Sequence, residues 1–157
     1  MLRHAHAGHA SEDHARRLDE RGRDEARRVG ERLYQRGWVP EMVLASDSAR
    51  TRETWKIVAA ELHRSGVEAR FSRSLYTSGR AALPEAASDI DIGMHTAMAI
   101  GHNPDFEELC SVLCGHTITL APANAALLTV DAAAWDEALV LDGSWQLEDI
   151  LHGNADD

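Results

Sequence analysis

The 157-residue sequence has only two cysteines, one lysine and no long apolar run, and each scarcity excludes a class of protein. Cys110 and Cys114 stand four residues apart in a segment typical of a helix, a spacing that makes neither a disulfide framework nor a complete zinc site. No apolar run approaches the roughly 18 residues of a membrane span, and no charged-then-apolar leader opens the chain. We therefore expect a cytoplasmic protein with two ordinary thiols and no membrane association.

The chain also lacks internal repeats and any long tract of glycine, serine or proline that would indicate a linker. A chain of this length buries roughly two-thirds of the surface that its unfolded form exposes, which is enough for one core. We therefore expect a single domain over residues 1–157.

Positive charge is scarce as well, because the formal net charge is -10. Nucleic-acid binders hold the phosphate backbone with surplus lysine and arginine along one face, so this charge argues against a nucleic-acid partner. Lys56 is the one lysine beside fifteen arginines. A local cationic pocket would therefore be built from arginine, whose planar guanidinium suits bidentate contact with phosphate.

Short apolar runs alternate with longer amphipathic stretches, which predicts an α/β fold. We expect a three-layer α/β/α sandwich with a mostly parallel sheet. The first expected strand ends at Leu2. The other expected strands cover residues 42–45, 67–71, 97–100, 125–130 and 145–151.

Capping residues and helical spacing predict the helices between these strands. One helix follows Asp19 as N-cap and stops at Gly37, and a second carries the apolar stripe of residues 55–62 and ends near Gly66. A short helix is expected over residues 83–87, with Pro84 in its first turn. A last helix is expected after residue 103, with Asn103 as N-cap and Pro104 as first helical residue.

Polar residues suited to phosphate follow three of the expected strands. Arg3 and His4 follow the first, residues 46–50 follow the second, and Gly101 and His102 follow the strand that ends at residue 100. Ligands of open α/β sheets collect at the carboxyl ends of strands, and helices that start there direct positive dipole ends at an anion. These segments predict a pocket of imidazole and guanidinium groups around a phosphate.

The order of these motifs resembles the histidine phosphatase superfamily (branch 1), and within it the small SixA-like phosphohistidine phosphatases. Residues 2–7 resemble the opening Arg-His motif, and residues 16–22 resemble the start of the first helix of the family. Residues 46–54, residues 75–76 and residues 101–104 are similar to its later blocks. The resemblance covers most of the chain and implies a phosphoglycerate-mutase-like fold.

The resemblance implies a role for each of these polar residues. His4 would be the catalytic nucleophile, and Arg3, Arg50 and His102 would complete the catalytic phosphate pocket, with Asn103 beside the substrate. Nearby guanidinium groups would keep His4 neutral, as attack on phosphorus requires. The phosphoryl group would pass to His4 and then to water, without a metal ion or cofactor.

The group that protonates the leaving group is open at the sequence level. Asn103 follows His102 where the phytase-like branch has aspartate, and Asp47 stands where the family usually has proline. Asp47 is therefore either a possible acid or a turn residue. An imidazole nitrogen leaves more readily than an alkoxide, so a substrate with a P–N bond needs such an acid less.

These motifs predict a phosphatase that removes phosphate from a phosphohistidine on a protein, for example a signalling phosphotransfer domain. A phosphatase of a small phosphorylated molecule and a low-turnover phosphohistidine-binding module are the alternatives. A zinc site is a weaker one, because only His6 and His9 remain near the N-terminus as ligands once His4 is a nucleophile.

The expected first strand is short, because only Met1 and Leu2 precede Arg3. Strands usually have about 5 to 6 residues. The sequence leaves open whether this brevity reflects truncation or a start further upstream.

Overall fold

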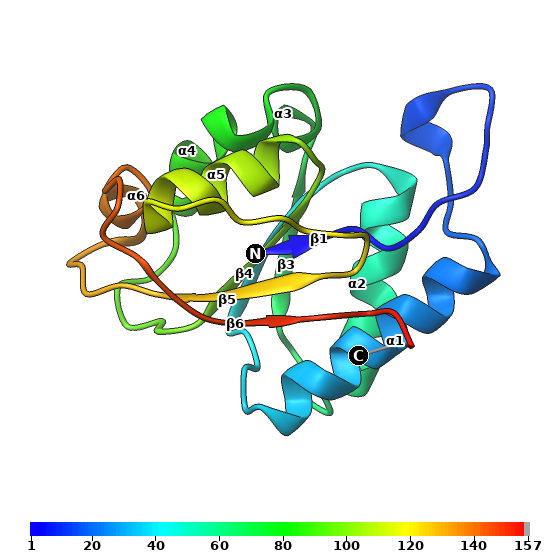
Figure 1. The fold of residues 1–157 in the computed structure, drawn as a ribbon, viewed down its shortest axis with the longest axis horizontal. Helices are drawn as coiled ribbons and strands as arrows, with labels where there is room; N and C mark the ends of the chain where they lie inside the picture. The colour runs from blue at the N-terminus through cyan, green and yellow to red at the C-terminus, as the bar shows by residue number, and fades with distance from the viewer. Residues whose placement is uncertain (156–157) are drawn as a thin grey trace.

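The computed structural model describes residues 1–155, and a six-stranded sheet with the order β3-β2-β4-β1-β5-β6 forms its centre (Figure 1). The strands are β1 (Leu2–Arg3), β2 (Met42–Ser46), β3 (Glu68–Ser72), β4 (Ala97–Gly101), β5 (Ala125–Thr129) and β6 (Gln146–Leu151). β1 pairs in parallel with β4 and antiparallel with β5, and β5 pairs antiparallel with β6. β5 thus runs against the other five strands, so the expectation of a mostly parallel sheet is confirmed.

Helices cover both faces of this sheet and make the three-layer α/β/α sandwich that the sequence predicts (Figure 1). The helices are α1 (Glu20–Gln35), α2 (Ala49–Glu61), α3 (Arg73–Thr77), α4 (Leu83–Ala87), α5 (Asp105–Cys114) and α6 (Trp135–Ala138). α1 and α2 pack on one face, and α3 to α6 pack on the other. Within residues 1–155, no helix has the length and apolar character needed to cross a membrane.

The central strand β2 shows why short apolar runs form this sheet. Its side chains alternate between the two cores, with Met42 and Leu44 packed against α4 and α5 and with Val43 and Ala45 packed against α1 and α2. Because both faces of the sheet are covered, the strand is apolar from Met42 to Ala45, and all five of its residues, Ser46 included, are buried.

Most of the expected helix boundaries are confirmed. The Asp19 side chain accepts a hydrogen bond from the backbone N–H of Gly22 and caps α1. α4 spans the expected residues, with a proline in its first turn. α2, however, ends at Glu61 and not near Gly66, because His63 already has a φ of 50° and turns the chain out of the helix.

The prediction that Asn103 caps α5 is wrong. Pro104 occupies the N-cap position, and the helix begins at Asp105. The side-chain amide of Asn103 donates instead to the carbonyl oxygen of Leu120, at 2.9 Å, so it is not available to the helix. The peptide bond between Asn103 and Pro104 is cis.

β1 has two residues, as the sequence led us to expect, and lies in the middle of the sheet. Leu2 stands opposite Ile100 of β4 on one side and opposite Ala125 of β5 on the other. Both neighbouring strands extend beyond β1 at its N-terminal end. A cavity of about 370 Å³ opens there, lined mostly by apolar residues of β4, β5 and both helix layers.

Candidate functional site

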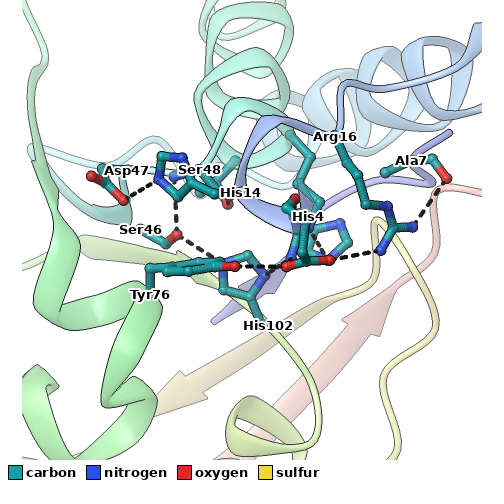
Figure 2. Close-up of polar contacts among 12 residues, drawn as sticks. His4, Ala7, His14, Arg16, Ser46, Asp47, Ser48, Tyr76 and His102 are labelled. Carbon is teal, nitrogen blue, oxygen red and sulfur yellow. Dashed lines mark hydrogen bonds and ion pairs between the residues drawn. The ribbon is translucent and has the colours of Figure 1, made fainter. Parts of the chain in front are cut away.

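The carboxyl ends of β1 and β4 bring together two histidines that are far apart in the sequence. Arg3 and Gly101 are register partners in the two parallel strands, so the residues that follow them lie side by side. The ring centroids of His4 and His102 are 5.0 Å apart (Figure 2). The sheet therefore places two imidazoles at one edge, where ligands of α/β folds bind.

Arg50, in the first turn of α2, joins these two imidazoles. Its Nε donates to Nε2 of His4 and one of its terminal nitrogens donates to Nδ1 of His102, each at 3.2 Å. The guanidinium is held firmly, because only 7% of the Arg50 side chain is exposed. Thr54, one turn further along α2, accepts from the backbone N–H of Ala5 and donates to the carbonyl of Arg50, so the helix is tied to the segment after His4.

The hydrogen bonds also determine which nitrogen of each imidazole carries a proton. Nδ1 of His4 lies 2.8 Å from the carbonyl oxygen of Ala5, which only accepts, so this nitrogen is protonated. Nε2 of His4 therefore presents its lone pair toward the guanidinium. In His102 the order is reversed, because Nδ1 accepts from Arg50 and Nε2 donates to Oγ of Ser46 at 2.7 Å.

Gly101 is required immediately before His102. A Cβ at this position would lie 2.4 Å from a ring carbon of Phe106, which is a buried residue of α5. The absence of a side chain lets α5 pack directly behind His102 and fixes the turn that carries it.

Burial and positive neighbours keep both imidazoles neutral. Burial, followed by the charges of His102, Arg50 and Arg3, lowers the pKa of His4 to about 3, although the hydrogen bond to the Ala5 carbonyl acts in the opposite direction. Burial followed by the charge of Arg50 lowers the pKa of His102 to about 4. At neutral pH both rings are therefore neutral, and each keeps one unprotonated nitrogen, which here accepts a hydrogen bond from Arg50.

These lowered pKa values predict a loss of stability in mild acid. Between about pH 6.5 and pH 4 the unfolded chain binds protons at His4 and His102 that the folded protein does not, so the free energy of unfolding falls as the pH falls. At about pH 5 each of these two histidines should lower the free energy of unfolding by about 2 kcal/mol relative to neutral pH. Urea unfolding across this range measures the effect.

Two variants sharpen this experiment. A double variant with His4→Asn and His102→Asn should flatten the dependence on pH. His116→Asn, at an exposed position beyond α5, should leave it unchanged. A wild-type free energy of unfolding that stays constant between about pH 6.5 and pH 5 would contradict the burial of two neutral imidazoles.

Arg3 and Asn103, also singled out from the sequence, converge on one backbone group. A terminal nitrogen of Arg3 and the side-chain amide of Asn103 both donate to the carbonyl of Leu120, at 2.8 and 2.9 Å. Nε of Arg3 is buried and has no hydrogen-bond partner among residues 1–155. The Arg3 charge lowers the pKa of both imidazoles, so its guanidinium acts on the same cluster.

Asp47 lies further out. Its carboxylate contacts Nε2 of His14 at 2.7 Å, and Figure 2 shows this pair beside each other and away from His4. Arg73 is at the limit of an ion pair with the same carboxylate, at 4.0 Å. The structure thus brings Asp47 to the rim of the cluster and not into contact with His4.

Sequence reasoning missed two residues, Asp13 and Tyr76, that contact the group formed by His4, His102 and Arg50. Asp13 lies in a 3-10 turn and forms an ion pair with Arg50 at 3.1 Å. The hydroxyl of Tyr76 donates to the same carboxylate, and the Tyr76 ring packs edge-on against His14 and His102. In the sequence Tyr76 stands out only as part of the motif at residues 75–76, and no spacing rule points to Asp13.

The histidines considered for zinc have other surroundings. Nδ1 of His6 is paired with Asp19 at 2.6 Å, and His9 is exposed. Among residues 1–155, no group of three or more histidine, cysteine, aspartate or glutamate side chains is arranged to hold a metal ion.

Comparisons with known proteins agree with this geometry. Residues 1–75 match the family model described as histidine phosphatase superfamily (branch 1). An uncharacterized chloroplastic protein of Arabidopsis thaliana is 36% identical over 167 residues, which cover 96% of this chain and 75% of that protein.

Solved structures share the fold over nearly all of the chain. The putative phosphohistidine phosphatase SixA from Agrobacterium tumefaciens is 24% identical, with a TM-score of 0.74 over 96% of this chain and 94% of that one. Its counterpart from Nakamurella multipartitia is also 24% identical, with a TM-score of 0.81 over 96% and 92%. The protein histidine phosphatase SixA complexed with tungstate is 23% identical, with a TM-score of 0.76 over 97% and 94%.

The paired imidazoles at the edge of a mixed α/β sheet and these matches define a class of phosphoryl-transfer proteins. The chain belongs to branch 1 of the histidine phosphatase superfamily, and its fold is that of this superfamily. Membership supports a phosphatase activity on a phosphorylated substrate.

Proposed function

We propose that the protein removes the phosphoryl group from a phosphohistidine on another protein, with His4 as the nucleophile. The observation that carries this proposal is the guanidinium of Arg50, which bridges Nε2 of His4 and Nδ1 of His102. A guanidinium next to an unprotonated nucleophile holds the oxygens of a phosphoryl group at attacking distance. The SixA relative solved with tungstate, a tetrahedral oxyanion, supports the same use of this fold.

In the first step the lone pair of Nε2 of His4 attacks phosphorus. The bond between Nε2 and phosphorus forms while the P–N bond of the substrate breaks, and a substrate ring that is already protonated on its other nitrogen takes the electron pair and leaves as neutral imidazole. Nδ1 of His4 stays protonated on the carbonyl of Ala5, which disperses the positive charge that develops on the ring. In the second step water attacks phosphorus, and inorganic phosphate leaves His4 neutral again.

Arg50, Arg3 and His102 stabilise the phosphoryl oxygens in both steps. Each cationic contact at about 4 Å contributes on the order of 4 kcal/mol at an effective dielectric constant of about 20, before desolvation. A bound phosphoryl dianion also raises the pKa of His102, because an opposite charge favours the protonated ring. His102 then becomes a donor to the phosphoryl group, and Asn103 lies next to it.

Transfer of labelled phosphate tests the proposal. The protein is mixed with ³²P-phosphoramidate or phospho-imidazole and quenched in base, and the acid-labile label is mapped. Label on His4 together with release of inorganic phosphate is expected. Binding of the probe without transfer would contradict the enzyme and indicate a phosphohistidine-binding module. Transfer from a small phosphate ester but not from a phosphohistidine protein would indicate a small phosphorylated molecule as the substrate.

Asp47→Asn tests the possible general acid. We expect turnover of phospho-imidazole to change less than about threefold, because imidazole needs little help to leave and the carboxylate contacts His14. Turnover of an aryl phosphate is measured beside it. A selective loss on the aryl phosphate would identify Asp47 as the acid, and rates unchanged from the wild type on both substrates would exclude it from the mechanism.

A further inference from the structure

The segment after the Arg-His motif forms a loop whose base is fixed to the rest of the chain. Ala7 and Leu18 form an isolated antiparallel bridge, and the N–H of Gly8 donates to the carbonyl of Arg17. Residues 8–17, here named the Asp13 loop, project from this base at the upper right of Figure 1. The 3-10 turn at its tip has no buried residue. Polar contacts therefore hold the tip in place.

Those contacts are made with Arg50, which bridges His4 and His102, and with Tyr76 beside them. Arg50 donates to the backbone carbonyl of Asp13 at 2.7 Å and to its carboxylate at 3.1 Å. Tyr76 donates to the same carboxylate oxygen at 2.8 Å, and Arg16 donates to the other oxygen at 3.1 Å. Two guanidiniums and one hydroxyl thus surround the carboxylate of Asp13. The same donors would suit the oxygens of a phosphoryl group.

The donors of Arg50 are nearly all in use. A guanidinium has five N–H groups, and contacts with His4, His102 and the two groups of Asp13 engage four of them. A phosphoryl group that binds the guanidinium in a bidentate way needs two donors, so it must displace one of these partners. His4 and His102 follow buried strands, whereas 53% of the Asp13 side chain is exposed. The carboxylate of Asp13 is therefore the partner that can leave.

We propose that Asp13 is a positioning residue that acts as a resident anion: its carboxylate holds Arg50 between the two imidazoles and is displaced by the phosphoryl group of the substrate. This inference rests on the proposed function, because it assumes that Arg50 binds the phosphoryl group. Displacement frees the hydroxyl of Tyr76 and the guanidinium of Arg16 for the incoming anion. Asp13 thereby weakens the binding of every free phosphate, including the product.

The charge of Asp13 persists at neutral pH. The hydrogen bond from Tyr76 holds the pKa of this carboxyl well below its usual range, and Arg16 and Arg50 act in the same direction. The same contact raises the pKa of Tyr76. Both partners therefore keep the protonation states that the hydrogen bond requires.

Binding of inorganic phosphate to Asp13→Asn tests the inference. Asparagine keeps the shape of the side chain and removes the competing charge, so the dissociation constant of phosphate should fall about tenfold. With phospho-imidazole, KM should fall and kcat should not rise, because the product leaves more slowly. Glu12→Gln removes a charge from the neighbouring exposed position and should change phosphate binding less than about twofold.

Unchanged or weaker phosphate binding in Asp13→Asn would overturn the inference. So would a loss of kcat that grows with the pKa of the leaving group across aryl phosphates, because that result would make Asp13 a general acid. Direct binding separates this outcome from the proposed function. If the wild type is labelled on His4 but Asp13→Asn does not bind phosphate more tightly, only the role of Asp13 is wrong. If Asp13→Asn binds phosphate more tightly but the wild type is not labelled, only the phosphatase mechanism is wrong.

Discussion

His4→Asn should lower the turnover of phospho-imidazole by at least about 10⁴-fold and abolish the labelled intermediate. Asparagine still fits beside Ala5 and Arg50, but its amide nitrogen has no lone pair available to attack phosphorus. The remaining groups of the cluster would still bind phosphate. Single-turnover assays with a ³²P-labelled probe measure both the rate and the transfer.

The control for this prediction is His116→Asn, which removes an imidazole from an exposed turn after α5. Turnover of this variant should stay within about twofold of the wild type. Substantial turnover by His4→Asn, with label on a different residue, would refute the assignment of the nucleophile while leaving the fold and family membership intact.

The second large effect is expected at Arg50. Arg50→Ala should lower kcat by about 10³-fold, because it removes the group that bridges both imidazoles and stabilises the transferring phosphoryl group. Arg50→Lys should recover only part of this loss, because an ammonium cannot reach His4, His102 and the phosphoryl group as a planar fork. Steady-state kinetics on phospho-imidazole give both numbers.

Arg52→Ala is the matched control for Arg50. Arg52 lies two residues further along α2, with its guanidinium 4.3 Å from the centre of the Phe71 ring, and it touches neither imidazole. Its removal should alter kcat less than about threefold. A comparable loss in both variants would mean that α2 as a whole is disturbed and that the bridging contact is not the cause.

The sequence predicted the sheet well because its strands are buried on both faces. Val43 and Leu44 face opposite cores, and such a run of apolar residues has few other places in a globular chain. The convergence of His4 and His102 followed from the same logic, since parallel neighbours end at one edge. These parts of the site depend on regular structure, which local patterns encode.

The contacts of Asp13 could not be predicted in this way. It reaches Arg50 across 37 residues and Tyr76 across 63, from a loop without periodicity. Asn103 shows the opposite error, since its position suited a helix cap, but a carbonyl 17 residues away competes for the same amide. Long-range hydrogen bonds between loops decide both cases, and no local propensity reports them.

The two-residue length of β1 has a consequence for the motions of the protein. Beyond its pairing with β4 and β5, the segment that carries His4 is held by single hydrogen bonds to Gly101, Ala123 and Thr54, with a cavity at the other end of the strand. A two-residue strand has few ladder hydrogen bonds, so it opens by local unfolding at a lower free energy than β2, which pairs with β3 and β4 along its length. Amide hydrogen exchange at the nucleophile should therefore be faster than in β2, and loss of activity should precede loss of the global fold.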